Sequence, residues 1–210
     1  MYLAIKLVYM KIGITINEVL RNYIGQLAYT YEKYIDDIDI TEKDVTNFNL
    51  IEFFKFDSVD KLNSFIYLEA PLEIFGHAGQ MSDGLMNHFN NFISEIIDDG
   101  EHEIELVSRE VEKSIPSTYF FLSKTNCRAN KLRFVTTHAE KWDTLDILIT
   151  ANPKALESKP SGKISVKVNA PYNKDIVADY EIDSILDFIN NDELRDKILN
   201  TKITTYEEIK

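Results

Sequence analysis

The feature that most constrains the fold is a regular alternation of short apolar segments with helical patterns in the second half of the chain. The apolar segments are expected to form strands at residues 104–108, 132–136, 145–150 and 163–168. Helices are expected between and after them, at residues 116–124, 137–142 and 153–158. Strands that alternate with helices in this way form a parallel sheet with helices on both faces. We therefore predict an α/β fold with a three-layer, Rossmann-like parallel sheet.

The first half of the chain predicts one more buried strand and then an insertion. Residues 11–16 are almost all apolar, which is typical of a strand buried on both faces. Asn17 is expected to cap a helix that follows at once, and the last strand, at 163–168, is expected at a sheet edge. We predict a core made of residues 11–35 and 100–174, with a small helical cap insertion at 36–99. We also predict an N-terminal arm at 1–9 and a C-terminal helical tail at 175–210, with its helix near 181–199.

Composition narrows the functions available to such a fold. The formal net charge is -12, which argues against nucleic-acid binding, since that depends on Lys and Arg meeting phosphates. We interpret the acidic stretches as solvated surface, with an acidic face for a basic partner as the alternative. No apolar run of about 18 residues occurs, so no membrane span is expected. The four histidines have no metal-ligand spacing and are expected to be structural.

Four stretches of sequence, in this order and spacing, carry a resemblance to a known family. They are Ile12–Leu20, Glu105–Arg109, Glu140–Ile149, and Lys159–Ile164 with Pro171–Asn173. Together they resemble the haloacid dehalogenase (HAD) superfamily and, within it, the 5′(3′)-deoxyribonucleotidase-like proteins, over about residues 11–174. The resemblance implies a HAD-like core with the insertion at 36–99 as its cap.

The resemblance also implies where the chemistry would lie, and there this chain departs from the family. The first strand of the family ends in Asp-x-Asp, which supplies the nucleophile, the acid/base and a magnesium ligand; the matching positions are Thr15 and Asn17. A carboxylate pair of the family completes the metal site after a later strand; the matching positions are Thr150 and Ala151. A neutral hydroxyl without a base is a poor nucleophile, and an amide carries no proton at neutral pH.

At two further positions, this chain has the residue types that the family uses. By resemblance, Ser108 would hydrogen-bond a phosphate and Lys141 would neutralise its charge. Magnesium prefers anionic oxygen ligands, so we expect no metal, no cofactor and no phosphatase activity. Asp146 is expected at the opposite end of its strand, far from this site.

Three functions stay open at this point. The first is a catalytically inactive binding or assembly subunit with other protein subunits as partners. The chain is rich in Ile, Asn, Lys and Asp, as AT-rich genomes encode. Together with the resemblance to a nucleotidase with degenerate motifs, this composition leads us to interpret it as a bacteriophage product of the host cytoplasm or the virion. The second is a residual nucleotidase in which Glu18, Asp143 or Asp146 takes over, although Glu18 is expected to point away. The third is a metal-independent nucleotide or phosphate sensor that uses Ser108 and Lys141.

Overall fold

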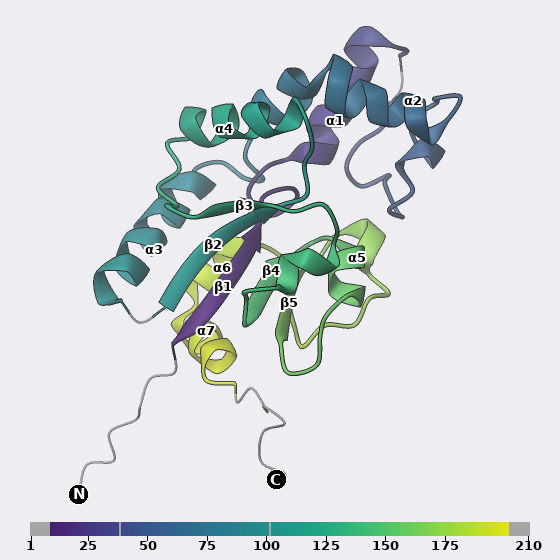
Figure 1. Cartoon of the computed structure of the whole chain (residues 1–210). Coiled ribbons are helices and arrows are strands. Elements are labelled where there is room, and N and C mark those ends of the chain that lie inside the picture. The colour runs from purple at the N-terminus through teal and green to yellow at the C-terminus, as the bar shows by residue number, and fades with distance from the viewer. Residues whose placement is uncertain (1–8, 38, 101, 202–210) are drawn as a thin grey trace, which may run out of the picture.

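The computed structural model describes residues 9–37, 39–100 and 102–201, and within them a six-stranded sheet forms the centre of the molecule (Figure 1). All neighbouring strands pair in parallel, and their order is β3-β2-β1-β4-β5-β6. The strands are β1 (Met10–Thr15), β2 (His102–Ser108), β3 (Leu132–Phe134), β4 (Ile147–Thr150), β5 (Ile164–Val168) and β6 (Tyr180–Ile182). The predicted α/β class and parallel sheet are confirmed.

Helices cover both faces of this sheet. On one face, apolar residues of α3, α6 and α7 pack with β1, β2 and β4 in the main core; on the other, Trp142 and Leu145 pack with Val107, Leu148 and Ala155. The helices are α1 (Tyr23–Tyr34), α2 (Val59–Ser64), α3 (Leu85–Asp99), α4 (Ser114–Lys124), α5 (Pro153–Glu157), α6 (Ile185–Asn190) and α7 (Asp192–Leu199). Single 3₁₀ or π turns lie at Leu50–Glu52, Phe65–Glu69, Leu72–Gly76, Ala139–Trp142 and Pro171–Asn173.

The segment between α1 and α3 forms a second, smaller apolar cluster. Tyr31 of α1 packs edge-on to Phe56 and Phe65, with ring centroids 5.3 and 6.5 Å away. Figure 1 shows α1 and α2 together, beside the sheet rather than on it. Helix α3, by contrast, contributes Phe89 and Phe92 to the main core. Within the insertion assigned to residues 36–99, the apolar residues of α3 up to Ile96 therefore pack on the sheet, and α1 packs with the rest of the insertion.

Several local predictions are corrected by the structure. Asn17 is not the cap of the first helix: α1 begins at Tyr23, and Asn22 caps it by accepting from the Gly25 N–H at 2.9 Å. The chain first makes a tight turn, in which the N–H groups of Leu20 and Arg21 both donate to the Ile16 carbonyl.

The sheet edge was also predicted wrongly. β5 is buried along its whole length, because β6 pairs with it and takes the edge position. Residues 180–182 therefore form a strand, although the terminal helical region was expected to begin at 181. A strand this short, with one buried apolar residue, gives little periodic signal in the sequence.

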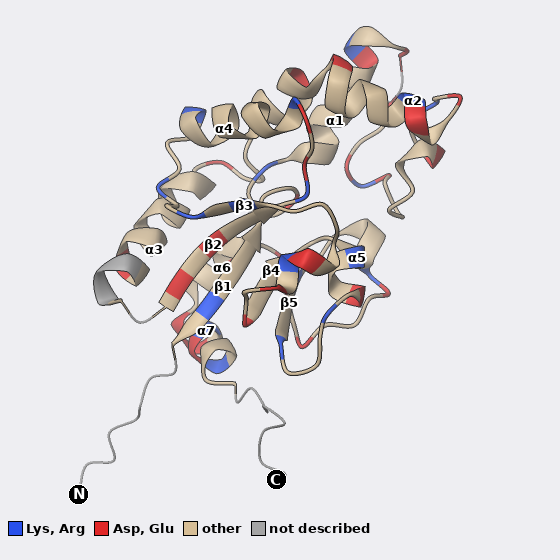
Figure 2. Ribbon diagram, in the orientation of Figure 1, with Lys and Arg blue, Asp and Glu red and all other residues tan. Residues whose placement is uncertain are grey.

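Charged residues are spread over the described surface. Figure 2 shows Asp and Glu on most elements, interleaved with Lys and Arg. None of the helices in the described part of the chain could reach across a bilayer as an apolar span. The predicted arm at 1–9 lies outside the described residues except for Tyr9, whose hydroxyl donates to Glu103 at 2.9 Å.

Candidate anion site

The carboxyl ends of β1, β2 and β4 bring three of the predicted positions together. β1 lies between β2 and β4, with Thr15 in register with Val107 and Ile14 in register with Ile149. Ser108 and Thr150 each follow one residue later, so the three hydroxyls end adjacent strands at the same sheet edge. The order of strands reverses direction at β1, and ligands of open α/β sheets bind at such a switch point.

Neutral oxygens occupy the two positions where the resemblance implies metal-binding carboxylates. The Thr15 hydroxyl donates to the Thr150 hydroxyl at 3.0 Å, and the Thr150 oxygen also accepts from the Asn152 N–H at 3.1 Å. Ala151 is buried and offers only a carbonyl, which accepts from the Asn173 amide at 2.8 Å. Among the described residues, no group of three or more His, Cys, Asp or Glu could hold a metal ion.

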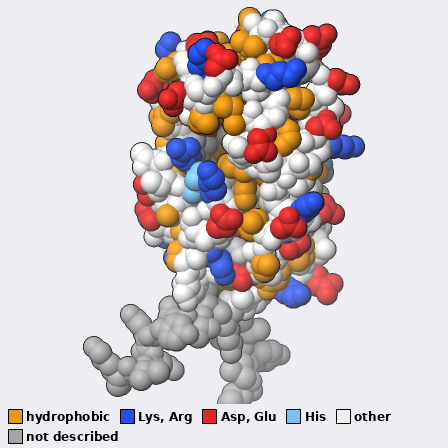
Figure 3. Space-filling view, turned by 90° about the vertical axis from the view of Figure 1, so that its right-hand side faces the viewer, with side chains coloured by type: hydrophobic (Ala, Val, Ile, Leu, Met, Phe, Trp, Pro, Cys, Tyr) orange, Lys and Arg blue, Asp and Glu red, His pale blue; other side chains and the backbone are white. Residues whose placement is uncertain are grey.

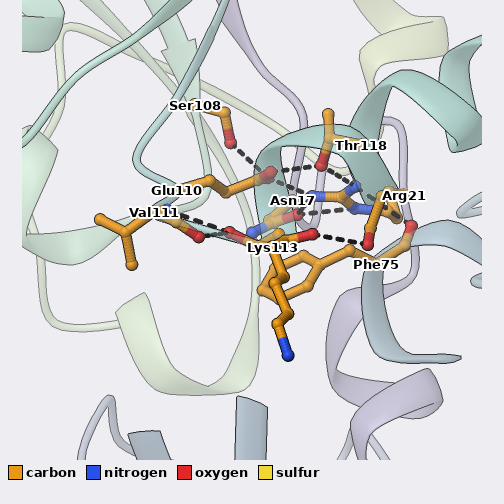
Figure 4. A network of polar contacts seen from close by, with 10 residues as sticks. Asn17, Arg21, Phe75, Ser108, Glu110, Val111, Lys113 and Thr118 are labelled. Atoms are coloured by element: carbon orange, nitrogen blue, oxygen red, sulfur yellow. Dashed lines mark hydrogen bonds and ion pairs between the residues drawn. The ribbon is translucent and has the colours of Figure 1, made fainter. Parts of the chain in front are cut away.

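Two more of the predicted positions, Asn17 and Ser108, form hydrogen bonds with a buried ion pair (Figure 4). The Arg21 guanidinium is fully buried and pairs with the Glu110 carboxylate. It also donates to the Asn17 side-chain carbonyl from Nε at 2.8 Å, while the Ser108 hydroxyl donates to Glu110 at 2.7 Å. The same guanidinium reaches Thr118 of α4 at 2.6 Å.

The same network connects the site to the segment between α1 and α3. Arg21 donates to the Phe75 carbonyl at 3.2 Å, and its guanidinium carbon lies 5.0 Å from the Phe75 ring centroid. A buried charge is tolerated when it is paired and fully hydrogen-bonded. Asn17 and Ser108 therefore both have partners within this network, and the Ser108 hydroxyl hydrogen is donated to Glu110.

Lys141 lies in the cavity that the resemblance assigned to it, and it lies there without a partner. Its side chain is only 4 % exposed, and within the described part of the chain its ammonium makes no ion pair or hydrogen bond. Burial, reinforced by the nearby charge of Arg109, lowers the pKa of Lys141 to about 8, with Glu110 acting weakly in the opposite direction. The neighbouring Trp142 fixes this turn by donating from its indole nitrogen to the Ala155 carbonyl at 2.8 Å.

Three cavity residues were missed by the sequence analysis. Arg109 follows Ser108 directly, His138 precedes Lys141 by one turn, and Lys154 is the second residue of α5, after the end of β4. The His138 ring is half-buried and its Nδ1 is a buried polar atom with no described hydrogen-bond partner. Burial lowers its pKa to about 4, aided by the charges of Lys141, Arg109 and Lys154. Their place just after strand ends was the signal available in the sequence.

One carboxyl group reaches the cavity, contrary to the expectation for Glu18. The backbone of Glu18 has a φ of 60°, in the left-handed region, and this turns the side chain inward, where it accepts from the Ile24 N–H at 2.8 Å. Burial raises its pKa to about 7, with a further contribution from Glu42. Asp146 lies at the other end of β4 as predicted, where it accepts from the Lys11 N–H at 2.9 Å.

The cavity that these residues enclose has a volume of about 320 Å³. Its second wall comes from the segment between α1 and α3 and is largely apolar, with Phe48, Ile66 and Tyr67. Phe48 also touches the polar wall, since the Lys154 ammonium lies 5.9 Å from its ring centroid. Figure 3 shows one face of the molecule on which Lys and Arg side chains gather around a histidine, beside hydrophobic side chains.

Comparison with solved structures identifies this fold. A haloacid dehalogenase-like hydrolase from Bacteroides fragilis superposes with a TM-score of 0.56 at 14 % identity, over 85 % of this chain and 98 % of that one. The HAD-hydrolase YfnB from Bacillus subtilis, whose structure contains magnesium, gives 0.55 at 12 % identity over 91 % and 99 %. A haloacid dehalogenase-like hydrolase from Burkholderia xenovorans gives 0.56 at 10 % identity over 89 % and 98 %. No protein-family model and no curated protein matches the sequence. The chain has the fold of the haloacid dehalogenase-like hydrolases.

Proposed function

We propose that this HAD-fold chain does not hydrolyse phosphate esters and instead binds a small anion, such as a phosphate group, without a metal ion. One observation carries the proposal. Arg109, Lys141 and Lys154 line the same cavity, and none of the three forms an ion pair with a carboxylate among the described residues. In a chain with a net charge of -12, cations left unpaired around one cavity favour an anionic occupant.

The burial of Lys141 strengthens the argument. An unpaired buried ammonium costs stability, and proteins retain such a cost mainly where function requires it. A bound anion would supply the missing partner, because charge-assisted hydrogen bonds to phosphate oxygens are strong. Arg109 and Lys154 are exposed enough to adjust to a ligand, whereas Lys141 is held by the turn that contains Trp142.

The donor set at the strand ends does not fit magnesium. Mg²⁺ binds in near-octahedral oxygen shells that include one or two carboxylates, whereas Thr15 and Thr150 offer hydroxyls that already bond to each other. Without such an ion, phosphoryl transfer lacks its main electrostatic stabilisation. Among the described residues, Glu18 supplies the one carboxyl group that lines the cavity, and its Oε1 accepts from the Ile24 N–H. These contacts support binding without turnover.

Calorimetry with inorganic phosphate at pH 7, in a zwitterionic buffer with EDTA, tests the binding. We expect a dissociation constant of about 1 mM or tighter, and at least about tenfold weaker binding in Lys141→Met and in Arg109→Ala, since each removes one charge-assisted contact. Arg128→Ala is the matched control, because Arg128 is exposed and lies outside the cavity. Absence of binding to the wild-type protein at millimolar phosphate would refute the proposal.

A turnover assay tests the second half of the proposal. Deoxynucleoside monophosphates and p-nitrophenyl phosphate are incubated with the protein and Mg²⁺, and phosphate release is compared with that of Thr15→Ala. We expect equal, background rates. A wild-type rate well above that of Thr15→Ala would favour the residual nucleotidase instead. An additional role as a subunit of a larger protein assembly, of phage or other origin, stays a prediction from the sequence.

A further inference from the structure

The Lys141 amine has the surroundings of a nucleophile as well as those of an anion ligand. Lys141 is more than nine-tenths buried, lines the cavity and has no described hydrogen-bond acceptor. Buried lysines without a counter-charge are the ones that lose their proton readily and attack carbonyl carbons. No other lysine that lines this cavity is buried, since Lys154 is exposed.

We propose that Lys141 forms an imine with small aldehydes that carry a phosphate or a comparable anionic group. The proposal rests on the anion site described above. Arg109 and Lys154 would hold the anionic group, and the neutral amine of Lys141 adds to the aldehyde carbon. The carbonyl oxygen and the two amine hydrogens leave together as water, and a C=N double bond replaces the C=O bond. No oxidant, reductant or metal is needed.

The state of the amine supports this chemistry. Burial lowers the pKa of Lys141 to about 8, whereas that of an exposed lysine is about 10.4. At pH 7.5 the neutral fraction of the Lys141 amine is thus about two orders of magnitude above that of an exposed lysine. Arg109 and Lys154, whose charges act on His138 in the same cavity, also explain why an anionic aldehyde is favoured over a neutral one, because both attract the negative group.

The size of the cavity limits the ligand. A volume of about 320 Å³ is at the lower end for small-molecule sites, which admits a small ring or a short chain with one phosphate. Phe48 and Tyr67 on the apolar wall provide contact area for the part of the aldehyde that carries no charge. Pyridoxal 5′-phosphate combines an aldehyde, a small ring and one phosphate, and it is therefore a suitable probe rather than an assigned ligand.

The test is chemical trapping on the full-length protein. Protein and pyridoxal 5′-phosphate are mixed at pH 7.5, reduced with borohydride, and mapped by peptide mass spectrometry. We expect Lys141 to be modified at least about tenfold faster than exposed Lys174, since burial raises the neutral fraction of the Lys141 amine. Pyridoxal without the phosphate should react at least about tenfold more slowly at Lys141, because it lacks the charged contacts. Inorganic phosphate should protect Lys141 and leave Lys174 unaffected.

Controls separate this inference from the anion site itself. In Lys141→Met the fast-forming adduct should disappear; in Lys174→Met it should remain. If phosphate binds by calorimetry but Lys141 is not modified faster than Lys174, the imine is refuted and the anion site stands. If Lys141 reacts equally with pyridoxal and its phosphate, and inorganic phosphate neither binds nor protects, then the anion site is refuted and, with it, the selectivity for anionic aldehydes.

Discussion

Replacing Lys141 by methionine should stabilise the protein, and the size of the effect follows from the structure. Burial lowers the pKa of Lys141 from 10.5 to about 8, and one pKa unit corresponds to about 1.4 kcal/mol of free energy. Carrying the charged lysine in the folded state thus costs about 3 kcal/mol relative to the unfolded chain. Methionine keeps most of the volume and removes the charge, so Lys141→Met should gain up to about 3 kcal/mol in free energy of unfolding at pH 7.

The difference in stability between Lys141→Met and the wild type should depend on pH, which a difference in packing alone would not produce. Between pH 8 and 10.5 the unfolded chain binds a proton at Lys141 that the folded protein has released, so the stability of the wild type rises with pH in that window. The gap between Lys141→Met and the wild type should therefore be largest below pH 8 and should close toward pH 10.5. Because a bound anion stabilises only the wild type, added phosphate at pH 7 should also narrow the gap.

Urea denaturation followed by circular dichroism, at pH 7, 9 and 10.5, measures these differences. Lys174→Met, at an exposed position outside the cavity, is the control and should change the free energy of unfolding by less than about 0.5 kcal/mol. A Lys141→Met variant that is less stable than the wild type at pH 7, or a gap that does not change with pH, would show that Lys141 is not an unpaired buried charge.

Four other predictions follow from the site. Burial raises the pKa of Glu18 from 4.5 to about 7, so the stability of the wild type falls as pH rises from 4.5 through 7. In urea denaturation, Glu18→Gln should be more stable than the wild type by about 3 kcal/mol at pH 8. Below pH 4.5 the two proteins should be equally stable. Glu110→Gln leaves the fully buried Arg21 charge unpaired and should cost about 3–5 kcal/mol by the same measurement; a loss below about 1 kcal/mol would contradict the network. Burial and three nearby cations lower the pKa of His138 to about 4, so its ring protons should show no titration between pH 5 and 8 by NMR. The double variant Thr15→Asp/Thr150→Asp places two carboxylates where the hydroxyls lie 3.0 Å apart, and it should gain a Mg²⁺-dependent rise in melting temperature that the wild type lacks.

Much of the fold could be predicted from local pattern. The strands at 104–108 and 163–168 were placed within two residues of their observed ends, because strands buried on both faces are continuous apolar runs. The start of the first helix was predicted wrongly because a local turn precedes it. Asn17 has the residue type of a helix cap, but its oxygen accepts from Arg21 instead, within a turn that displaces the start of α1 to Tyr23.

The positions of the site followed from the sequence, whereas its electrostatics did not. The resemblance implied that Thr15, Ser108 and Thr150 lie at one site, and the structure brings them together because the carboxyl ends of neighbouring parallel strands meet at one edge. That Ser108 would be engaged by a carboxylate, and that Glu18 would turn inward, depended on backbone geometry that residue type alone does not reveal.

Sequence alone thus placed the first five strands along the chain and, with them, the residues at which these strands end. Only the tertiary structure decided which charged groups are paired and which are left alone. Arg21 and Glu110 pair across 89 positions of the chain, while Lys141 is buried and none of the described residues pairs with its ammonium. The physical reason is that pairing and desolvation depend on distances between segments far apart in sequence, whereas strand and helix patterns depend on neighbours along the chain.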